Sequence, residues 1–253
     1  MPVRLKDIDE TLRELLKPDE FSDYCPNGVQ IEGKDEIKKI VTGVTACRAL
    51  VEAAIKEKAD LILVHHGYFW RGEEPTITGL KKARIQLLLR HDISLCAYHL
   101  PLDAHPELGN NAQLAKVLGI NLLAPLDSAK KHPIVFSGDL SVPQSFRNFE
   151  AFLEAKLERK PLSIEGNSEE IRLIAWCSGA AQEFIGLAVE SGADAYLTGE
   201  VSEQTVHIAR ESGIHFFAAG HHATERYGIQ ALGEYLARKY SIAHMFVDIP
   251  NPA

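Results

Sequence analysis

Two adjacent histidines, His65 and His66, follow the uninterrupted apolar run Leu61–Val64 and precede Gly67. A run of Leu, Ile and Val is typical of a strand that helices cover on both faces, as in parallel sheets. Neighbouring side chains of a strand point to opposite faces, so the two imidazoles can address one metal ion only past the strand end, where the chain turns at the glycine. Taken alone, however, the pair is more simply interpreted as polar loop residues.

Further candidate ligands follow two later strands, expected at Ile93–Ala97 and Ile214–Ala218. Both strands lead into a histidine that precedes a carboxylate by four positions, namely His99 with Asp103 and His221 with Glu225. In sheets of this type the carboxyl ends of parallel strands meet at one rim, where ligands bind. The two motifs and the histidine pair are therefore all expected at the rim where the carboxyl ends of the strands meet.

Each carboxylate also has a simpler structural interpretation. Asp103, which comes shortly after Pro101, is typical of a helix N-cap or a turn. If Thr224 opens the last helix, Glu225 is a first-turn carboxylate that the helix dipole favours. Together with His65, His66 and His221, however, these carboxylates make five possible ligands at equivalent strand ends, and that number favours a common metal site.

The candidate ligands are three imidazoles and two carboxylates: His65, His66, Asp103, His221 and Glu225. This set is too large for one tetrahedral zinc with an open position, and it suits two divalent ions bridged by a shared carboxylate. Zinc, iron, manganese and nickel all accept such ligands. A bridged metal pair activates water, so the chemistry expected is hydrolysis of a ring C–N or phosphate bond.

The composition limits the classes of protein. Of the 253 residues, 45% are hydrophobic and 25% are charged, as in soluble globular proteins. The net charge of −8 argues against broad nucleic-acid binding, although a local basic patch from Lys81, Lys82, Arg84 and Arg90 stays open. No apolar run approaches the roughly 20 residues of a membrane span, and no signal sequence is recognised. Four scattered cysteines without a Cys-x-x-Cys pair indicate a reducing cytoplasm.

The two halves of the chain, 1–125 and 126–253, show the same order of elements. Glu57-Lys58-Ala59-Asp60 falls opposite Ser191-Gly192-Ala193-Asp194, each just before a buried strand. The pattern predicts an α/β fold made by a domain-sized internal duplication, with one mixed, mostly parallel sheet flanked by helices in each half. A chance likeness between α/β segments is the alternative. Helices are expected at 5–16, 46–58, 78–89, 110–118, 145–159, 180–191, 203–212 and 224–239. Strands are expected at 29–31, 37–44, 61–64, 93–97, 134–140, 161–164, 171–177, 195–197, 214–218 and 244–249.

Three motifs together resemble the NIF-three-like family, and its short bacterial, YbgI-like members in particular. They are His65-His66-Gly67, His99-x-x-x-Asp103 followed by Asn110-Asn111, and Gly220-His-His-Ala-Thr-Glu-Arg226. The resemblance covers essentially the whole chain, including Asn27-Gly28 in the first loop.

The resemblance implies that the five candidate ligands bind two metal ions and that the two α/β domains are intertwined. It also implies a ring-shaped homohexamer with the sites facing an internal cavity. Short members are often labelled GTP cyclohydrolase 1 type 2 homologues, which implies a metal-dependent hydrolase of a nucleotide or related small molecule. The alternative is a metal-loaded ring that binds or regulates a protein or nucleic-acid partner without turnover. His99 is assigned to orienting Asp103 or a bound ligand rather than to the metals.

Overall fold

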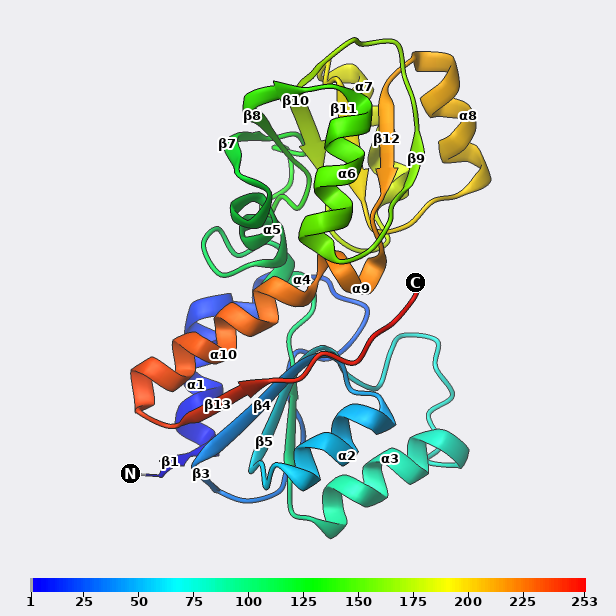
Figure 1. Ribbon diagram of the computed structural model, residues 1–253. Coiled ribbons are helices and arrows are strands. Elements are labelled where there is room, and N and C mark those ends of the chain that lie inside the picture. The colour runs from blue at the N-terminus through cyan, green and yellow to red at the C-terminus, as the bar shows by residue number, and fades with distance from the viewer. Residues whose placement is uncertain (1) are drawn as a thin grey trace. The chain divides into compact units, whose positions relative to one another are not determined.

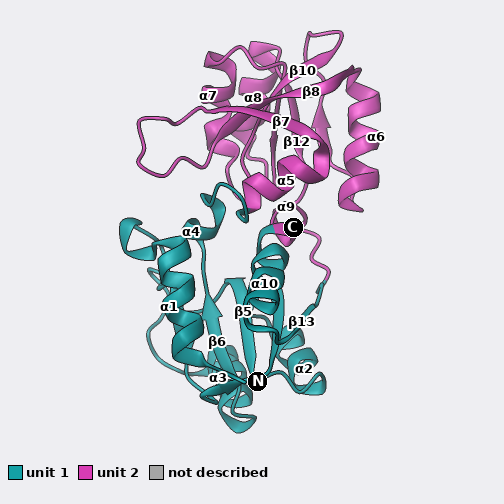
Figure 2. Cartoon of the chain, turned by 90° about the vertical axis from the view of Figure 1, so that its left-hand side faces the viewer, with its two compact units in different colours: residues 1–109, 228–249 teal, residues 110–227, 250–253 magenta. Residues whose placement is uncertain are grey.

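The computed structural model describes residues 2–253 and divides into two compact units (Figure 2). Residues 1–109 and 228–249 form unit 1, and residues 110–227 and 250–253 form unit 2. Each unit contains one main sheet with helices on both of its faces, so the fold is α/β as predicted.

Unit 1 has a five-stranded sheet in the order β13-β4-β5-β6-β2 (Figure 1). Its first three pairs are parallel, and β2 closes one edge antiparallel to β6. A separate two-stranded sheet joins β1 to β3. The strands are β1 (Val3–Arg4), β2 (Gly28–Ile31), β3 (Glu36–Ile37), β4 (Lys39–Thr45), β5 (Leu61–His66), β6 (Ser94–Ala97) and β13 (Ala243–Phe246).

The apolar run of β5 is buried on both faces. Leu61 and Leu63 pack into a core with helices α1 and α10, whereas Ile62 and Val64 pack into a second core with α2 and α3. This alternation explains why the strand has no polar residue before its histidines. The helices of unit 1 are α1 (Leu5–Leu16), η1 (Pro18–Glu20), α2 (Arg48–Lys56), α3 (Gly79–Arg90), α4 (Leu100–Asp103) and, for most of its length, α10 (Arg226–Tyr240).

Unit 2 has a six-stranded sheet in the order β7-β8-β10-β11-β12-β9. The central pairs β10-β11 and β11-β12 are parallel, and the three outer pairs are antiparallel. The strands are β7 (Ile120–Pro125), β8 (Phe136–Gln144), β9 (Leu162–Ile164), β10 (Ile171–Trp176), β11 (Ala195–Thr198) and β12 (His215–Ala218). The helices are α5 (Asn110–Leu118), α6 (Phe146–Leu157), η2 (Gln182–Phe184), α7 (Ile185–Glu190), α8 (Glu203–Ser212) and α9 (His221–Thr224).

Equivalent aspartates, Asp60 and Asp194, directly precede β5 in unit 1 and β11 in unit 2. Asp60 accepts backbone hydrogen bonds from Lys38 and Lys39 at 2.9 and 3.1 Å. Asp194 accepts backbone hydrogen bonds from Arg172 and Leu173, both at 2.9 Å. In both units the aspartate accepts hydrogen bonds from two backbone amides at the start of the preceding parallel strand, β4 or β10. An internal duplication predicts this shared arrangement.

Each half of the chain contributes its last helix and its last strand to the other unit. Helix α5 follows β6 of unit 1 but belongs to unit 2, and α10 follows β12 of unit 2 but packs into the core of unit 1 (Figure 2). The compact units therefore differ in extent from the sequence repeats 1–125 and 126–253, because the last helix and the last strand of each repeat belong to the other unit, α5 and β7 to unit 2 and α10 and β13 to unit 1. This exchange is the intertwining that the family resemblance implies.

Three local expectations are corrected by the structure. His65 and His66 lie within β5 and not past its end. Their ring centroids are nevertheless 4.5 Å apart. Pairing with β6 stops at Val64, whereas pairing with β4 continues to His66. The last long helix does not begin at Thr224, since Glu225 separates α9 from α10. The helix expected from residue 78 begins at Gly79, so Thr78 occupies the N-cap position of α3, without a capping hydrogen bond from its side chain.

Other helix ends agree with the sequence. Ser145 caps α6 by accepting a hydrogen bond from the Asn148 amide, and Gly119 ends α5 with a left-handed φ of 63°. The short elements β1, β3, α4 and β7 were not expected from the hydrophobic pattern. Within residues 2–253, no helix combines the length and the apolar character needed to cross a membrane.

Candidate metal centre

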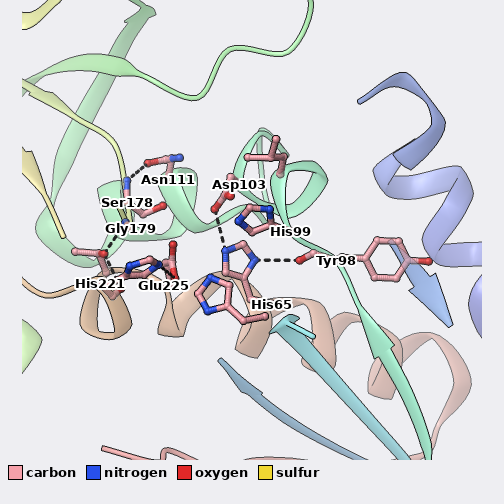
Figure 3. Close-up of polar contacts among 12 residues, drawn as sticks. His65, Tyr98, His99, Asp103, Asn111, Ser178, Gly179, His221 and Glu225 are labelled. Carbon is pink, nitrogen blue, oxygen red and sulfur yellow. Dashed lines mark hydrogen bonds and ion pairs between the residues drawn. The ribbon is translucent and has the colours of Figure 1, made fainter. Parts of the chain in front are cut away.

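The histidine of unit 1 with the least exposure is His65, whose side chain is fully buried. Its Nδ1 atom lies 3.0 Å from the backbone carbonyl of Tyr98, and its Nε2 atom lies 3.5 Å from Oδ1 of Asp103 (Figure 3). A carbonyl only accepts, so Nδ1 carries the proton and the lone pair of the neutral ring is on Nε2, the atom facing the carboxylate. Asp103 is buried at the end of α4, where Pro101 starts the helical turn.

His66 and His99 complete an imidazole cluster in unit 1. The Nδ1 atom of His66 lies 3.1 Å from the Thr45 hydroxyl of the neighbouring strand. The Nδ1 atom of His99 donates to Oδ1 of Asp23 at 2.7 Å. One ligand atom each of His65, His66 and His99 lie within 4.8 Å of one another, a spacing that a single metal ion could span. The His99 position is therefore open to a ligand role as well as to the orienting role expected from the sequence.

Asp23 holds the first loop of unit 1 against this cluster. Beyond its bond to His99, its second oxygen accepts from the Leu100 amide at 3.0 Å and from the Asn27 side chain at 2.8 Å. The Asn27 carbonyl oxygen in turn accepts from the His99 amide at 2.8 Å. Burial alone raises the pKa of Asp23, but the hydrogen bonds from His99, Asn27 and the backbone outweigh it and lower that pKa. The carboxylate is thus ionised at neutral pH and accepts a hydrogen bond from the imidazole.

In unit 2, His221 lies between two carboxylates. Its Nδ1 atom lies 2.6 Å from Oε1 of Glu200, and its Nε2 atom lies 3.2 Å from Oε2 of Glu225. Burial disfavours the charged ring, but hydrogen bonds and charges from Glu225 and Glu200 overcome that effect and raise the pKa of His221 to about 9. At neutral pH a proton therefore occupies Nε2 and faces the Glu225 carboxylate. A divalent ion bound in its place would contact both the ring nitrogen and that carboxylate.

Glycines leave the room that these side chains need. A Cβ atom on Gly179 would lie 2.1 Å from Oε1 of Glu225 and 3.3 Å from Nε2 of His221. Its amide donates to the Thr224 hydroxyl at 3.0 Å, and the neighbouring Ser178 amide donates to Oδ1 of Asn111 at 2.8 Å (Figure 3). The loop after β10 thus packs its bare backbone against the two predicted ligands of unit 2.

The five predicted ligands form two groups, one within each unit. His65, His66 and Asp103 come together in unit 1, and His221 and Glu225 come together in unit 2. Sequence reasoning did not assign a role to Asp23, Thr45 or Glu200. The alignment of the halves contained a signal for Glu200, because Gly199-Glu200 falls opposite His65-His66. Asp23 had no such signal, since its role depends on a loop approaching from a distant segment.

The fold and the two groups define an α/β protein of two similar units, whose clustered histidines are oriented by carboxylates, a backbone carbonyl and a hydroxyl. The sequence profile of the family described as Duf34/NIF3 (NGG1p interacting factor 3) matches residues 3–252. The chain belongs to this family. Among its curated relatives, a Pseudomonas aeruginosa protein is 52% identical over all 253 residues of both chains, and a Haemophilus influenzae protein is 55% identical over 98% of each. Both carry the name GTP cyclohydrolase 1 type 2 homolog.

Solved structures agree with this assignment. The structure of protein ybgI, described as of unknown function, superposes with a TM-score of 0.95 at 50% identity and covers 99% of this chain and 100% of its own. The crystal structure of TTHA1606 from Thermus thermophilus superposes with a TM-score of 0.89 at 31% identity, with 99% and 100% of the two chains covered.

Proposed function

We propose that this protein is a hydrolase that depends on two divalent metal ions and acts on a nucleotide or a related small molecule. The proposed ligands are His65, His66, Asp103, His221 and Glu225, three from unit 1 and two from unit 2. The name shared by the curated relatives supports a nucleotide substrate, and the ligand chemistry supports hydrolysis. Zinc, iron, manganese and nickel all suit imidazole and carboxylate ligands.

The observation that carries the proposal is the orientation of the imidazoles. Nδ1 of His65 faces a carbonyl oxygen, Nδ1 of His99 and of His221 each face a carboxylate, and Nδ1 of His66 faces a hydroxyl. In proteins that bind metals through histidine, the ring nitrogen that does not coordinate almost always donates to such an acceptor. The carbonyl beside His65 and the carboxylate beside His99 only accept, so they put the lone pair of each neutral ring on Nε2, the form a metal ion requires. His221 reaches the same form once its Nε2 proton leaves.

A bound divalent ion supplies a coordinated water whose pKa is near 7 and which is therefore a nucleophile at neutral pH. The chain's own residues fix the geometry around it. Tyr98 and Thr45 hold the two rings of β5, Glu200 holds His221, and the loop at Gly179 leaves space for the Glu225 carboxylate. His99, held by Asp23, is close enough to the other two imidazoles to contact a ligand bound there.

The test is a comparison of metal content and turnover between wild type and Asp103→Ala. Purified wild type is expected to carry up to two divalent ions per chain and to hydrolyse at least one compound among GTP, other nucleotides, phosphoesters and cyclic amides. Asp103→Ala is expected to lose metal and activity together. Asp19→Ala is the matched control, because this carboxylate is exposed and its ion pair with Arg13 spans 3.7 Å at the surface. Hydrolysis that survives in metal-depleted Asp103→Ala would indicate a contaminant and exclude the hydrolase.

We also propose a ring-shaped homohexamer in the cytoplasm, as the family resemblance implies. All four cysteines are free thiols, which supports a reducing compartment. Light scattering at micromolar concentration checks the assembly, and a monodisperse monomer would contradict it. A non-catalytic ring that binds nucleic acid has less support, since Lys81, one of the candidate basic residues, pairs with Glu73 at 3.1 Å and is mostly buried.

A further inference from the structure

Two aromatic side chains flank the imidazole cluster of unit 1. The ring of Trp70 lies 5.0 Å from that of His99 and 5.8 Å from that of His66. The ring of Tyr24 lies 6.3 Å from that of His99. Trp70 comes from the segment after β5 and Tyr24 from the segment before β2, so two loops bring aromatic surface to the same histidines. Neither residue is among the proposed metal ligands.

The backbone around Trp70 holds the indole in one place. Its Nε1 atom donates to the Gly67 carbonyl, and its amide donates to Oε2 of Glu73, both at 3.1 Å. Gly67 is packed so closely that a Cβ atom there would lie 2.3 Å from Oε1 of Gln30. Phe69, which is not a glycine, has a left-handed φ of 66°. Such a conformation costs free energy and persists only where surrounding contacts impose it, as at ligand sites.

Arg71 connects the two loops and adds a positive charge. Its amide donates to the Tyr24 carbonyl at 2.6 Å, and its Nη2 atom donates to the Asp23 carbonyl at 2.8 Å. Its guanidinium carbon lies 5.7 Å from the centroid of the Tyr24 ring. The Tyr24 side chain is nevertheless 56% exposed, and Arg71 is exposed as well. An exposed aromatic ring under a guanidinium, tied to the loop that orients His99, offers a surface that a ligand can cover.

We propose that Trp70, Tyr24 and Arg71 form a recognition wall for an anionic heteroaromatic ligand, a planar ring that carries a phosphate or carboxylate group. Indole and phenol faces stack on planar rings, as aromatic side chains do on nucleic-acid bases. A guanidinium pairs with phosphate or carboxylate through parallel hydrogen bonds. The wall rests on the proposed function in one respect, since it presents its ligand to the same imidazoles.

The test uses tryptophan fluorescence, because the chain has two tryptophans in different surroundings. Trp176 is fully buried and donates to the Asn111 carbonyl within unit 2, so it serves as an internal reference. The metal-loaded protein, in the oligomeric state in which it is purified, is titrated separately with three compounds. GMP carries both the ring and the charge, guanosine carries the ring alone, and ribose 5-phosphate carries the charge alone. GMP is expected to quench wild-type emission saturably and to bind at least tenfold more tightly than either fragment.

Variants separate the contributions of ring and charge, with affinity followed by calorimetry. Trp70→Phe is expected to lose the fluorescence signal and to bind GMP within a few-fold of wild type, whereas Trp70→Ala is expected to bind at least tenfold more weakly. Arg71→Ala is expected to weaken GMP but not guanosine. Arg90→Ala, which removes an exposed charge at the end of α3, is the control and should change nothing. Circular dichroism confirms that each variant is folded.

The results also distinguish the wall from the hydrolase. Saturable GMP binding that depends on Trp70 and Arg71, without turnover of any nucleotide, supports the wall and counts against the hydrolase. Nucleotide hydrolysis with an unchanged KM in both alanine variants supports the hydrolase and overturns the wall. Absence of saturable GMP binding to wild type, or equal affinity for ribose 5-phosphate, also overturns the wall.

Discussion

Glu200 lies 2.6 Å from the Nδ1 atom of His221 and, unlike Glu225 on the other side of the ring, is outside the proposed ligand set. Because Glu200 fixes the ring's tautomer, Glu200→Ala is expected to weaken metal binding about 10- to 100-fold. Folding should be little affected, since the Glu200 side chain is 39% exposed. Competition with a chromophoric chelator measures the affinity. Glu211→Ala, an exposed carboxylate on α8, is the control, and equal affinities in the two variants would remove the orienting role.

Metal binding is expected to release protons because the pKa of His221 is about 9 in the metal-free protein. At pH 7 the ring is charged, and a metal ion can coordinate it only after the Nε2 proton leaves. Titration calorimetry of metal into the chelated protein, repeated in buffers with different ionisation enthalpies, gives the number of protons released. His221→Asn should release about one proton fewer. An equal release from both proteins contradicts the assignment.

The same pKa predicts how the metal-free protein's stability depends on pH. The folded-state pKa of His221 lies above the unfolded value of about 6.5, so the native state holds the proton more tightly. The contribution is fully present below pH 6.5 and is lost as the pH rises through about 9. It amounts to up to about 3 kcal/mol. Urea unfolding of chelated wild type between pH 6 and pH 9.5 should show this decline, and chelated His221→Asn should show a flatter profile.

Much of the fold could be predicted because the hydrophobic patterns are local. The run before His65 predicts a buried strand, and the matching positions of Asp60 and Asp194 predict two similar units. The exchange of α5 and α10 could not be read from these patterns, since the apolar stripe of a helix does not specify which sheet it covers. Only the family resemblance indicated that the units are intertwined.

The sequence indicated which candidate ligands lie close together, but it did not indicate most of the residues that orient them. Strand ends and His-x-x-x-carboxylate spacing are visible in the sequence. The structure brings together His221 and Glu225, which share that spacing, and also His65 and Asp103, which follow neighbouring strands. Asp23 reaches His99 across 76 positions of the chain, and such a contact depends on tertiary packing. The break at Glu225 was also missed, because the Thr224 hydroxyl bonds backward to Gly220 rather than capping the helix that follows.

Removing Asp60 or its counterpart Asp194, each of which accepts hydrogen bonds from two backbone amides, should destabilise the protein. The pKa of Asp60 is lowered, since bonds from the Lys38 and Lys39 amides and from the Lys34 side chain outweigh the effect of burial. Asp60→Ala leaves two backbone donors without this acceptor, which costs about 1–3 kcal/mol. Chemical denaturation measures the loss. Because the lowered pKa stabilises the fold only above the unfolded value of about 3.9, the difference between wild type and Asp60→Ala should shrink as the pH falls below 4. Asp60→Asn keeps one acceptor oxygen and is expected to lose less.

A single methyl group added at Gly179 should act directly on the candidate metal centre. Its φ of 68° strains any other residue, and a Cβ atom there would lie 2.1 Å from Oε1 of Glu225. Gly192 is a matched control, because its φ is 73° and an added Cβ would meet nothing within 4 Å. Both alanine variants should therefore lose a similar roughly 1–3 kcal/mol to backbone strain. Only Gly179→Ala must also displace the Glu225 carboxylate, which is the flexible partner in this contact.

Gly179→Ala is accordingly expected to lose metal beyond its loss of stability. Elemental analysis after dialysis should find near wild-type metal in Gly192→Ala and a tenfold or greater loss of affinity in Gly179→Ala. Thermal unfolding in the presence of chelator compares the two without the metal, and there their Tm values should be close. If the two variants retain equal metal while Gly179→Ala is folded, then Glu225 does not hold a metal ion in the position that the loop after β10 leaves for it.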